Sequence, residues 1–109
     1  MTHEELFKKA LEDVKKYDPK PDEELLRALV ANYAIVLRNA DSSFVACTQK
    51  DELERVKKNF LLNKLFVDME DEEMDQVLKE VCQTIKGKKL RTTFYYLLTK
   101  KLGKRDAFV

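Results

Sequence analysis

The sequence predicts an all-α fold, a compact array of about five helices in a single helical domain spanning residues 1–109. Three observations indicate this fold class. Only two glycines and two prolines occur in 109 residues, so few positions interrupt a helix. Hydrophobic residues make up 44% of the chain, and charged residues 38%. Apolar residues recur at intervals of three and four along most of the sequence, which is the spacing of one helix face.

The segment Leu25–Leu37 is the predicted centre of this array. Eleven of its thirteen residues are apolar. A helix that is apolar nearly all round is covered by other helices on most sides. It is too short to cross a bilayer, which takes about 20 apolar residues. Its least apolar stripe consists of Arg27, Ala31, Ala34 and Arg38.

Local signals place the first two helices. Thr2 and Glu5 have the spacing of a capping box at the start of the first helix. The segment 18–21, Asp-Pro-Lys-Pro, ends this helix because a residue before proline avoids the α region. Asp22 is the predicted N-cap of the central helix, which continues to about Arg38.

Three more helices follow a polar connection. The third is predicted to begin with a capping box of Thr48 and Asp51, and to end just before Asp68. The fourth starts at Asp68, where several acidic residues favour a helix N-terminus. The fifth covers Leu90–Leu102, with Gly103 as the residue that ends it.

Three stretches between Asn39 and Gly103 resemble a family of short bacterial proteins classified as a domain of unknown function. They are NADSS, ELERVKKNFLLNKL and FYYLLTKKLGK, in the same order and spacing. The N-terminal third resembles this family more loosely. The resemblance implies a compact all-α fold in a small cytoplasmic bacterial protein. It implies no activity, cofactor or catalytic residue.

The cysteines and the N-terminus bear on location. Cys47 and Cys82 form no CxxC pair and are interpreted as small buried hydrophobic residues in a reducing compartment. The N-terminus lacks the apolar core of a signal peptide, and no later segment is long enough to span a membrane. We therefore predict a cytoplasmic protein without a membrane partner.

No group of residues predicts catalysis. A serine or cysteine nucleophile needs a base, and the one histidine is His3, at the start of the chain. Ser42, Ser43 and Cys47 therefore have no evident partner. The acidic run at 68–75 lacks the glycine of a calcium loop. We predict that the chain is not an enzyme, with no catalytic residues, no metal and no cofactor.

The C-terminal quarter is strongly basic, although the net charge is only +1. Residues 86–109 hold eight basic side chains and one acidic one. One interpretation is a nucleic-acid or other polyanion site, with Tyr95 or Tyr96 available for stacking. The other is neutralisation by the acidic start of the fourth helix. Even with this neutralisation, four basic residues at the turn have no acidic partner. These candidate polyanion-binding residues are Lys86, Lys88, Lys89 and Arg91.

A polar loop after the central helix is the second candidate site. Its residues are Asn39, Asp41, Ser42 and Ser43. Polar loops on a rigid scaffold often carry binding groups. The same residue types are also the ordinary ones for turning the chain, and we favour this second interpretation.

These observations favour a non-catalytic protein-interaction module with an unidentified protein partner. Several apolar residues lie outside clean helical faces and need a cover, which a homodimer would provide. They are Phe44, Val45, Phe66, Val67, Phe108 and Val109. The alternative is a nucleic-acid-binding protein that uses the basic turn.

Overall fold

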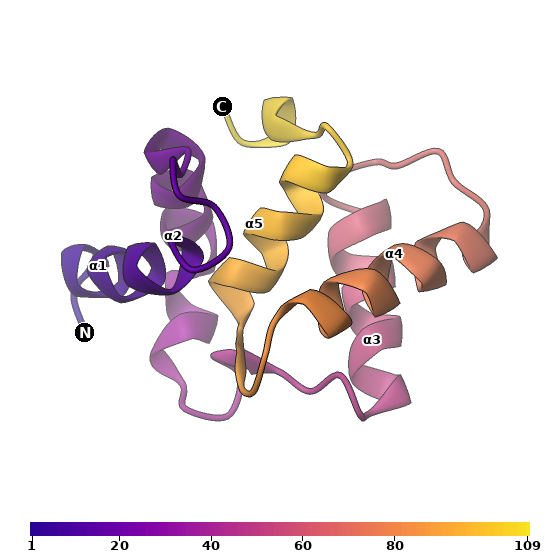
Figure 1. The fold of residues 1–109 in the computed structure, drawn as a ribbon, viewed down its shortest axis with the longest axis horizontal. Coiled ribbons are helices and arrows are strands. Elements are labelled where there is room, and N and C mark those ends of the chain that lie inside the picture. Colours follow the sequence, from indigo (N-terminus) through magenta and orange to yellow (C-terminus); the bar gives the residue numbers. More distant parts are fainter.

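The chain folds into five α-helices with a two-stranded sheet at one end, in a computed structural model that describes all 109 residues (Figure 1). The helices are α1 (His3–Val14), α2 (Glu23–Arg38), α3 (Lys50–Val56), α4 (Asp71–Thr84) and α5 (Arg91–Lys101). The strands are β1 (Phe44–Val45) and β2 (Lys89–Leu90), and α3 runs on into a π-helix, η1 (Lys57–Leu62). A short 3₁₀ helix, η2 (Arg105–Ala107), follows α5. The predicted helical fold is confirmed, and the small sheet is an addition to it.

Three predicted helix ends are confirmed. Thr2 and Glu5 form the capping box of α1. The Asp22 carboxylate caps α2 by accepting the Leu25 backbone N–H at 3.1 Å. Gly103 has a φ of +64° and its N–H donates to the Lys100 carbonyl. The N–H of Lys104 donates to the Thr99 carbonyl. This pair of bonds is a Schellman motif, in which glycine is favoured because φ is positive.

Two predicted starts are wrong. The third helix has Gln49 as its N-cap rather than Thr48, because Gln49 N–H donates to the Ala46 carbonyl and a turn occupies the position of Thr48. The fourth helix starts three residues later than predicted. Glu70 and Glu73 form its capping box, so Asp68 stays in the connection. Both errors arise where several acidic or polar residues compete for one cap.

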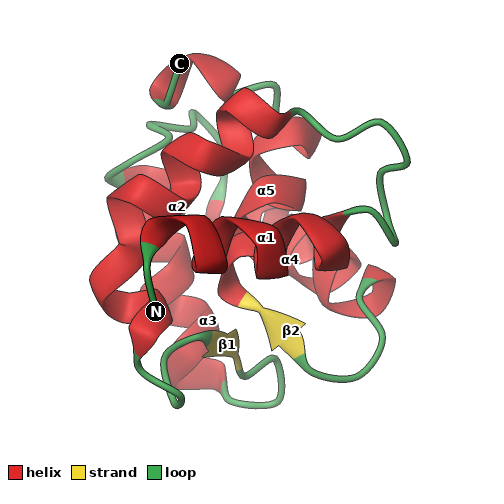
Figure 2. Cartoon of the chain, turned by 90° about the vertical axis from the view of Figure 1, so that its left-hand side faces the viewer, coloured by secondary structure: helices red, strands yellow, loops and turns green.

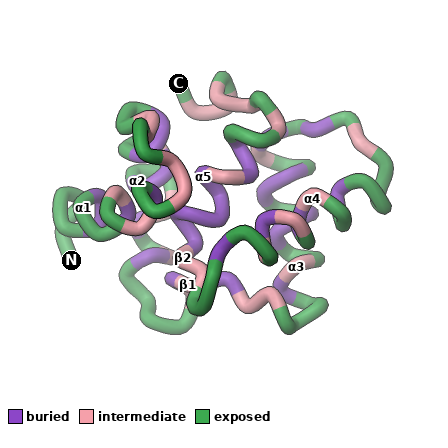
Figure 3. The backbone as a smooth tube through the Cα atoms, viewed as in Figure 1, coloured by how far each residue is buried: buried purple, intermediate pink, exposed green.

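Helix α5 is the most enclosed helix (Figure 3). Eight of its eleven residues are buried, against six of sixteen in α2. It lies between α2 and α4 and also contacts α1 (Figure 1). Three of its buried residues are threonines, Thr92, Thr93 and Thr99. The low apolar content of α5 explains why the sequence directs attention to α2 instead.

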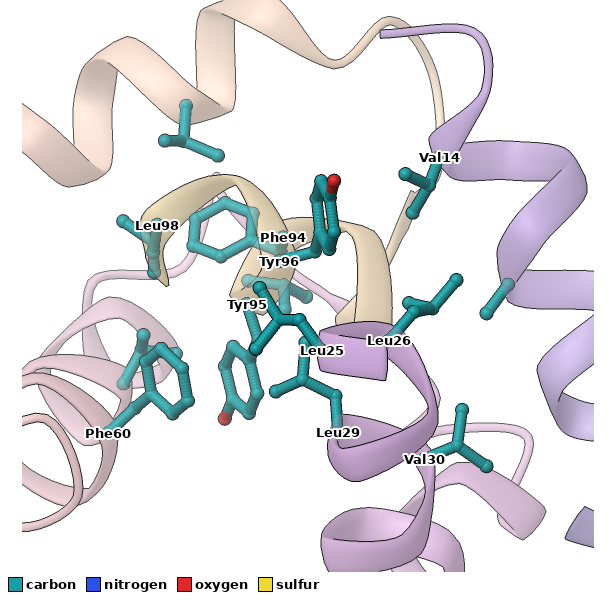
Figure 4. Close-up of a cluster of buried hydrophobic side chains, with 14 of the residues drawn as sticks. Val14, Leu25, Leu26, Leu29, Val30, Phe60, Phe94, Tyr95, Tyr96 and Leu98 are labelled. Carbon is teal, nitrogen blue, oxygen red and sulfur yellow. The ribbon is translucent and has the colours of Figure 1, made fainter. Parts of the chain in front are cut away.

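Adjacent tyrosines of α5 serve opposite sides of the core. The hydroxyls of Tyr95 and Tyr96 point in opposite directions (Figure 4). Tyr96 accepts a hydrogen bond from the Asp22 N–H at 2.9 Å and donates one to the Asp18 carboxylate at 2.5 Å. It therefore fixes both ends of the connection between α1 and α2. Tyr95 turns toward the other side, where the polar loop lies.

The two cysteines form a disulfide, so their interpretation as small buried hydrophobic residues in a reducing compartment is wrong. Cys47 and Cys82 are half-buried, with Cα atoms 6.0 Å apart. The bond joins the segment after β1 to the C-terminal half of α4. The two cysteines are 35 residues apart in sequence, so no local pattern indicates their pairing. The pairing arises because α4 packs beside the segment after β1. The disulfide also removes the cysteine argument for a reducing compartment.

The antiparallel strands join the two predicted site regions (Figure 2). Phe44 pairs with Leu90, and Val45 with Lys89. Val45 is buried within the chain, so this residue needs no cover from a second copy. The polar loop before β1 and the basic turn before β2 therefore lie side by side.

The connection after η1 contains the one non-glycine residue with positive φ. Phe66 has φ of +52° and its side chain is 75% exposed, whereas its neighbour Val67 is buried. The Val67 N–H donates to the Leu61 carbonyl at 3.1 Å and closes the turn. Glycine usually occupies such a position because a side chain is strained there.

Candidate functional site

The polar loop uses most of its polar groups to form its own turns. The Asn39 side-chain oxygen accepts the backbone N–H of Asp41 at 2.9 Å. The hydroxyls of Ser42 and Ser43 donate to nearby carbonyls at 2.7 and 3.0 Å. Asn and Ser commonly build turns with such bonds. Of the four predicted residues, the Asp41 side chain alone makes no hydrogen bond within the chain.

Arg91 holds this loop against α5. Its buried guanidinium donates to the carbonyls of Ser42 (2.6 Å) and Phe44 (3.3 Å). It also donates to the hydroxyl of Tyr95 at 2.9 Å and to the carboxylate of Glu52. Because four of its donors are bound inside the protein, Arg91 does not belong to the exposed basic turn in which the sequence analysis placed it.

The three lysines of the turn form no ion pairs. Lys86 and Lys88 are exposed and Lys89 is half-buried. The ammonium of Lys88 lies 5.3 Å from the ring centroid of Phe44, and that of Lys9 from α1 lies 5.9 Å from the same ring. The fold therefore removes Arg91 from the candidate polyanion-binding group and brings Lys9 to it.

Two of the other basic residues near the C-terminus, Lys101 and Arg105, are neutralised by ion pairs within the chain. Lys101 pairs with Glu80 of α4 at 3.3 Å. Arg105 pairs with Asp22 and Glu24 at the start of α2, both at 2.5 Å. The acidic partners thus come from α2 as well as from α4, whereas the sequence analysis considered only the start of α4.

A cleft of about 630 Å³ opens beside the polar loop, between the second half of α2, β1, α3 and η1. Its floor is formed by Arg91 and Tyr95 of α5. Polar side chains from separate elements line it, namely Asp41, Ser42, Gln49, Glu52, Arg55 and Asn59. Its apolar lining consists of Tyr33, Val36, Phe44, Ala46 and Val56. This cleft is the candidate functional site because it gathers the polar loop, the buried ion pair and the aromatic core.

Two helix irregularities border the cleft. Tyr33 has φ of −119° and ψ of 16°, which interrupts the regular helix of α2. On the opposite side, α3 widens into the π-helix that contains Asn59. Such widened turns occur frequently at functional sites because they displace side chains from the regular helical register. Both irregular segments contribute residues to the same cleft.

A three-residue ion network crosses the floor. Glu52 is only 8% exposed, and its two carboxylate oxygens accept from Arg91 (2.5 Å) and from Arg55 (2.9 Å). Burial raises the pKa of Glu52, but the hydrogen bonds from Arg91 and Arg55 outweigh burial and hold that pKa below its ordinary value. Glu52 therefore stays ionised and fixes both guanidiniums.

Aromatic rings form the wall behind this network. The rings of Phe60 and Tyr95 stack with centroids 3.9 Å apart, and Tyr33 meets Tyr95 edge-on at 5.0 Å. Phe60 and Tyr95 face each other in Figure 4. Burial raises the pKa of Tyr33 to about 12. The wall is rigid and apolar.

Glu52 and Arg55 were not among the site residues predicted from the sequence. A signal for Glu52 was available, because Glu52, Val56 and Phe60 recur every four residues and the last two are apolar. Arg55 carried no such signal, since arginines on a helix exterior are common. Its place beside Glu52 follows from their spacing of three residues on α3, and its place in the cleft depends on how α3 packs in the fold.

A second buried cation lies on the far side of α3. Lys57 is 4% exposed, and its ammonium contacts the carboxylates of Glu54 (3.1 Å), Asp71 (3.0 Å) and Asp75 (2.6 Å). Hydrogen bonds to Asp75 and the other two carboxylates raise the pKa of Lys57 despite burial. The cluster joins η1 to α4 and contains its own counter-charge.

The cleft and the Lys57 cluster do not resemble a metal centre. No group of three or more His, Cys, Asp or Glu side chains is placed to hold a metal ion. None of the helices combines the length and the apolar character that crossing a membrane requires.

These features define a small helical protein with an open, mixed polar and apolar cleft. Its sequence matches the family "Protein of unknown function (DUF2853)" over residues 9–106, so the chain belongs to this family. The resemblance to a domain of unknown function is thereby confirmed. No curated protein matches the chain.

Proposed function

We propose that the chain is a non-catalytic protein-interaction module that binds its partner through the second half of α2. One observation carries the proposal. Ile35 lies in a helix that buries most of its large apolar side chains, including Leu25, Leu29 and Leu37, yet Ile35 is 86% exposed. Covering an isoleucine side chain contributes about 1.5–3 kcal/mol to association.

The surroundings of Ile35 support a binding face. Ala31 and Asn32 are exposed beside it. A hollow of about 510 Å³ lies along this face and is bordered by His3 and Arg38. Tyr33 and Val36 line both this hollow and the cleft, so the two depressions share one ridge. An apolar partner segment has a recess to enter on either side of the ridge.

The absence of catalysis belongs to the same proposal. Ser42 and Ser43 donate their hydroxyl hydrogens to backbone carbonyls, an arrangement that serves the turn. Cys47 is held in a disulfide, and His3 forms no hydrogen bond with either serine. A nucleophile needs a base within hydrogen-bond reach, and these residues do not provide that pair.

Site-specific photo-crosslinking tests the binding face. We expect p-benzoylphenylalanine in place of Ile35 to form one defined crosslinked product in native lysate. The same probe in place of Lys79, an exposed residue of α4, is the control. A product of equal yield from both positions, or none from position 35, would contradict the proposal.

Sedimentation equilibrium then separates self-association from a different partner. A species of twice 12.8 kDa that dissociates in Ile35→Glu would identify a homodimer. A monomer at all concentrations would assign the crosslinked product to another protein. The bacterial origin and the cytoplasmic location stay predictions.

Nucleic-acid binding is the second candidate, and the clustering of Lys9 and Lys88 around Phe44 favours it. Binding through these lysines should weaken steeply as salt rises. Charge reversal of Lys86, Lys88 and Lys89 together should abolish it. Arg91 is left unchanged in this variant because it is buried. A sub-micromolar complex at physiological salt would rank this function above protein interaction.

A further inference from the structure

We infer that the cleft binds a carboxylate that is joined to an apolar group, with Arg55 as the residue that receives the carboxylate. The ligand is either a free carboxylic acid or the terminal carboxylate of a peptide, which share this chemistry. The inference concerns the cleft and does not depend on Ile35.

Arg55 has free donors in a fixed place. One of its terminal nitrogens donates to Glu52 at 2.9 Å, and its guanidinium forms no other hydrogen bond within the chain. A guanidinium has five N–H donors in a planar fork, so four remain for a ligand. The side chain is 60% exposed and lines the cleft. Solvent or a ligand must therefore satisfy these donors.

The support beneath Arg55 is unusually firm for a surface arginine. Glu52 is buried and bound on its other oxygen by Arg91, which is itself held by the Ser42 and Phe44 carbonyls. An arginine pinned in this way loses less conformational entropy when it binds a carboxylate. The network thus orients the free edge of the Arg55 guanidinium.

The charge of the lining favours a monoanion over a dianion. Two guanidiniums, Arg55 and Arg91, face two carboxylates, Asp41 and Glu52, so the lining is neutral in sum. A carboxylate brings a single charge and matches the planar fork with two parallel hydrogen bonds. A phosphate dianion brings one charge more, which the neutral lining does not offset.

The remainder of the cleft suits an apolar group and a neighbouring polar one. Tyr33, Val36 and Phe44 provide an apolar surface in the same cleft as Arg55. Asn59, at the border, is exposed and its amide forms no hydrogen bond within the chain. An apolar body on the wall and a carboxylate on Arg55 would occupy both surfaces of the cleft at once.

NMR titration of the full chain tests the inference with two acid probes, phenylacetate and N-acetylphenylalanine. We expect dissociation constants of about 1 mM, as few contacts exclude water in an open cleft. The shifts should map to the Arg55 Nε–H and the Asn59 side-chain amide. The matched neutral probes, phenylacetamide and N-acetylphenylalaninamide, should shift neither signal. The acid that binds more tightly identifies the source of the carboxylate.

Variants assign the binding to Arg55. Arg55→Gln should abolish it, and Arg55→Lys should weaken it about tenfold because the fork is lost. Lys58→Gln, a neighbouring exposed position outside the cleft, is the matched control and should bind as wild type. Asn59→Asp keeps Arg55 and should also weaken binding, because the new aspartate carboxylate repels the carboxylate of the probe.

Three results would overturn the inference. They are equal shifts from the acids and their amides, wild-type affinity in Arg55→Gln with an unchanged fold, and shifts that map to the lysine turn instead of the cleft. Inorganic phosphate serves as the competing anion. Displacement of phenylacetate by phosphate at equal concentration would reject the carboxylate assignment.

Discussion

The two buried cations of this protein, Arg91 and Lys57, are held in different ways. Arg91 donates to two loop carbonyls, a tyrosine hydroxyl and the buried carboxylate of Glu52. Lys57 is equally enclosed, but its three carboxylate partners are each more than half exposed. Arg91 therefore belongs to the interior of the protein, whereas Lys57 lies at the edge of the interior beside solvent-exposed carboxylates.

The difference shows that burial of a charge does not by itself fix its contribution to stability. Removing Arg91 takes away one of the two donors to the buried Glu52 carboxylate and the donor to two loop carbonyls. Removing Lys57 leaves carboxylates that water can hydrate again. Loss of Arg91 leaves buried polar groups without the hydrogen bonds that offset their desolvation. Loss of Lys57 leaves no such groups.

Arg91→Met should produce the largest effect. We expect the free energy of unfolding to fall by about 3 kcal/mol, because the buried Glu52 carboxylate loses one of its two partners and the loop carbonyls lose their donor. Urea denaturation followed by circular dichroism measures this change. The double variant Arg91→Met with Glu52→Met should recover part of the loss, since two apolar side chains replace the ion pair. A loss below 1 kcal/mol in the single variant would show that the loop carbonyls and Glu52 find other donors.

Loss of the disulfide should have the next largest effect. Cys47 lies just beyond the segment that Arg91 holds, and Cys82 belongs to the helix that Lys57 contacts. We expect the Cys47→Ser and Cys82→Ser double variant to be less stable by about 2–4 kcal/mol. Reduced wild type provides the matched comparison. If the bond and Arg91 restrain the same loop, their combined loss will differ from the sum of the separate losses.

Lys57→Met should cost about 1 kcal/mol or less. The methionine fills the space of the lysine stem, while Glu54, Asp71 and Asp75 remain exposed to water. Denaturation in low and high salt measures the effect, which should shrink as the repulsion among the three acids is screened. A loss as large as that of Arg91→Met would remove the distinction between the two cations.

The pH dependence of stability should reveal Glu52, with the smallest effect. The pKa of Glu52 is held below 4.5 in the folded protein. As the pH falls, the Glu52 carboxylate is therefore protonated in the unfolded chain before it is protonated in the folded one. The contribution of ionised Glu52 to the free energy of unfolding is complete above pH 4.5. It declines as the pH falls toward the pKa of Glu52 in the folded protein. The stability difference between wild type and Glu52→Gln should therefore narrow below pH 4.5. Glu72→Gln removes the same charge from an exposed position and is the reference.

The sequence was a good guide to helices and a weak one to the cleft. Caps such as Thr2, Asp22 and Gly103 act within one turn of the chain, so their signals are local and could be read directly. The boundaries at Thr48 and Asp68 failed because neighbouring residues are equally able to cap. The importance of α5 was underestimated, since its buried threonines and tyrosines do not look apolar.

The candidate site shows the same limit. The polar loop and the basic turn were both selected, but as separate sites. Their meeting depends on the pairing of Phe44 with Leu90 across 46 positions, and on the reach of Arg91 to the Ser42 carbonyl. Cys47 and Cys82 were likewise treated as independent. Such pairings have no local signature, because either partner alone fits several environments.

The sequence by itself therefore determined the helical class, most helix ends and the excess of basic residues near the C-terminus. These follow from apolar periodicity, capping and composition, which act over a few residues. Tertiary structure alone decided that Arg91 is buried, that Lys9 joins the basic turn, that the cysteines are bonded and that Arg55 faces a cleft. Each of these depends on contacts between residues distant in sequence, whose energies are settled only when the helices pack together.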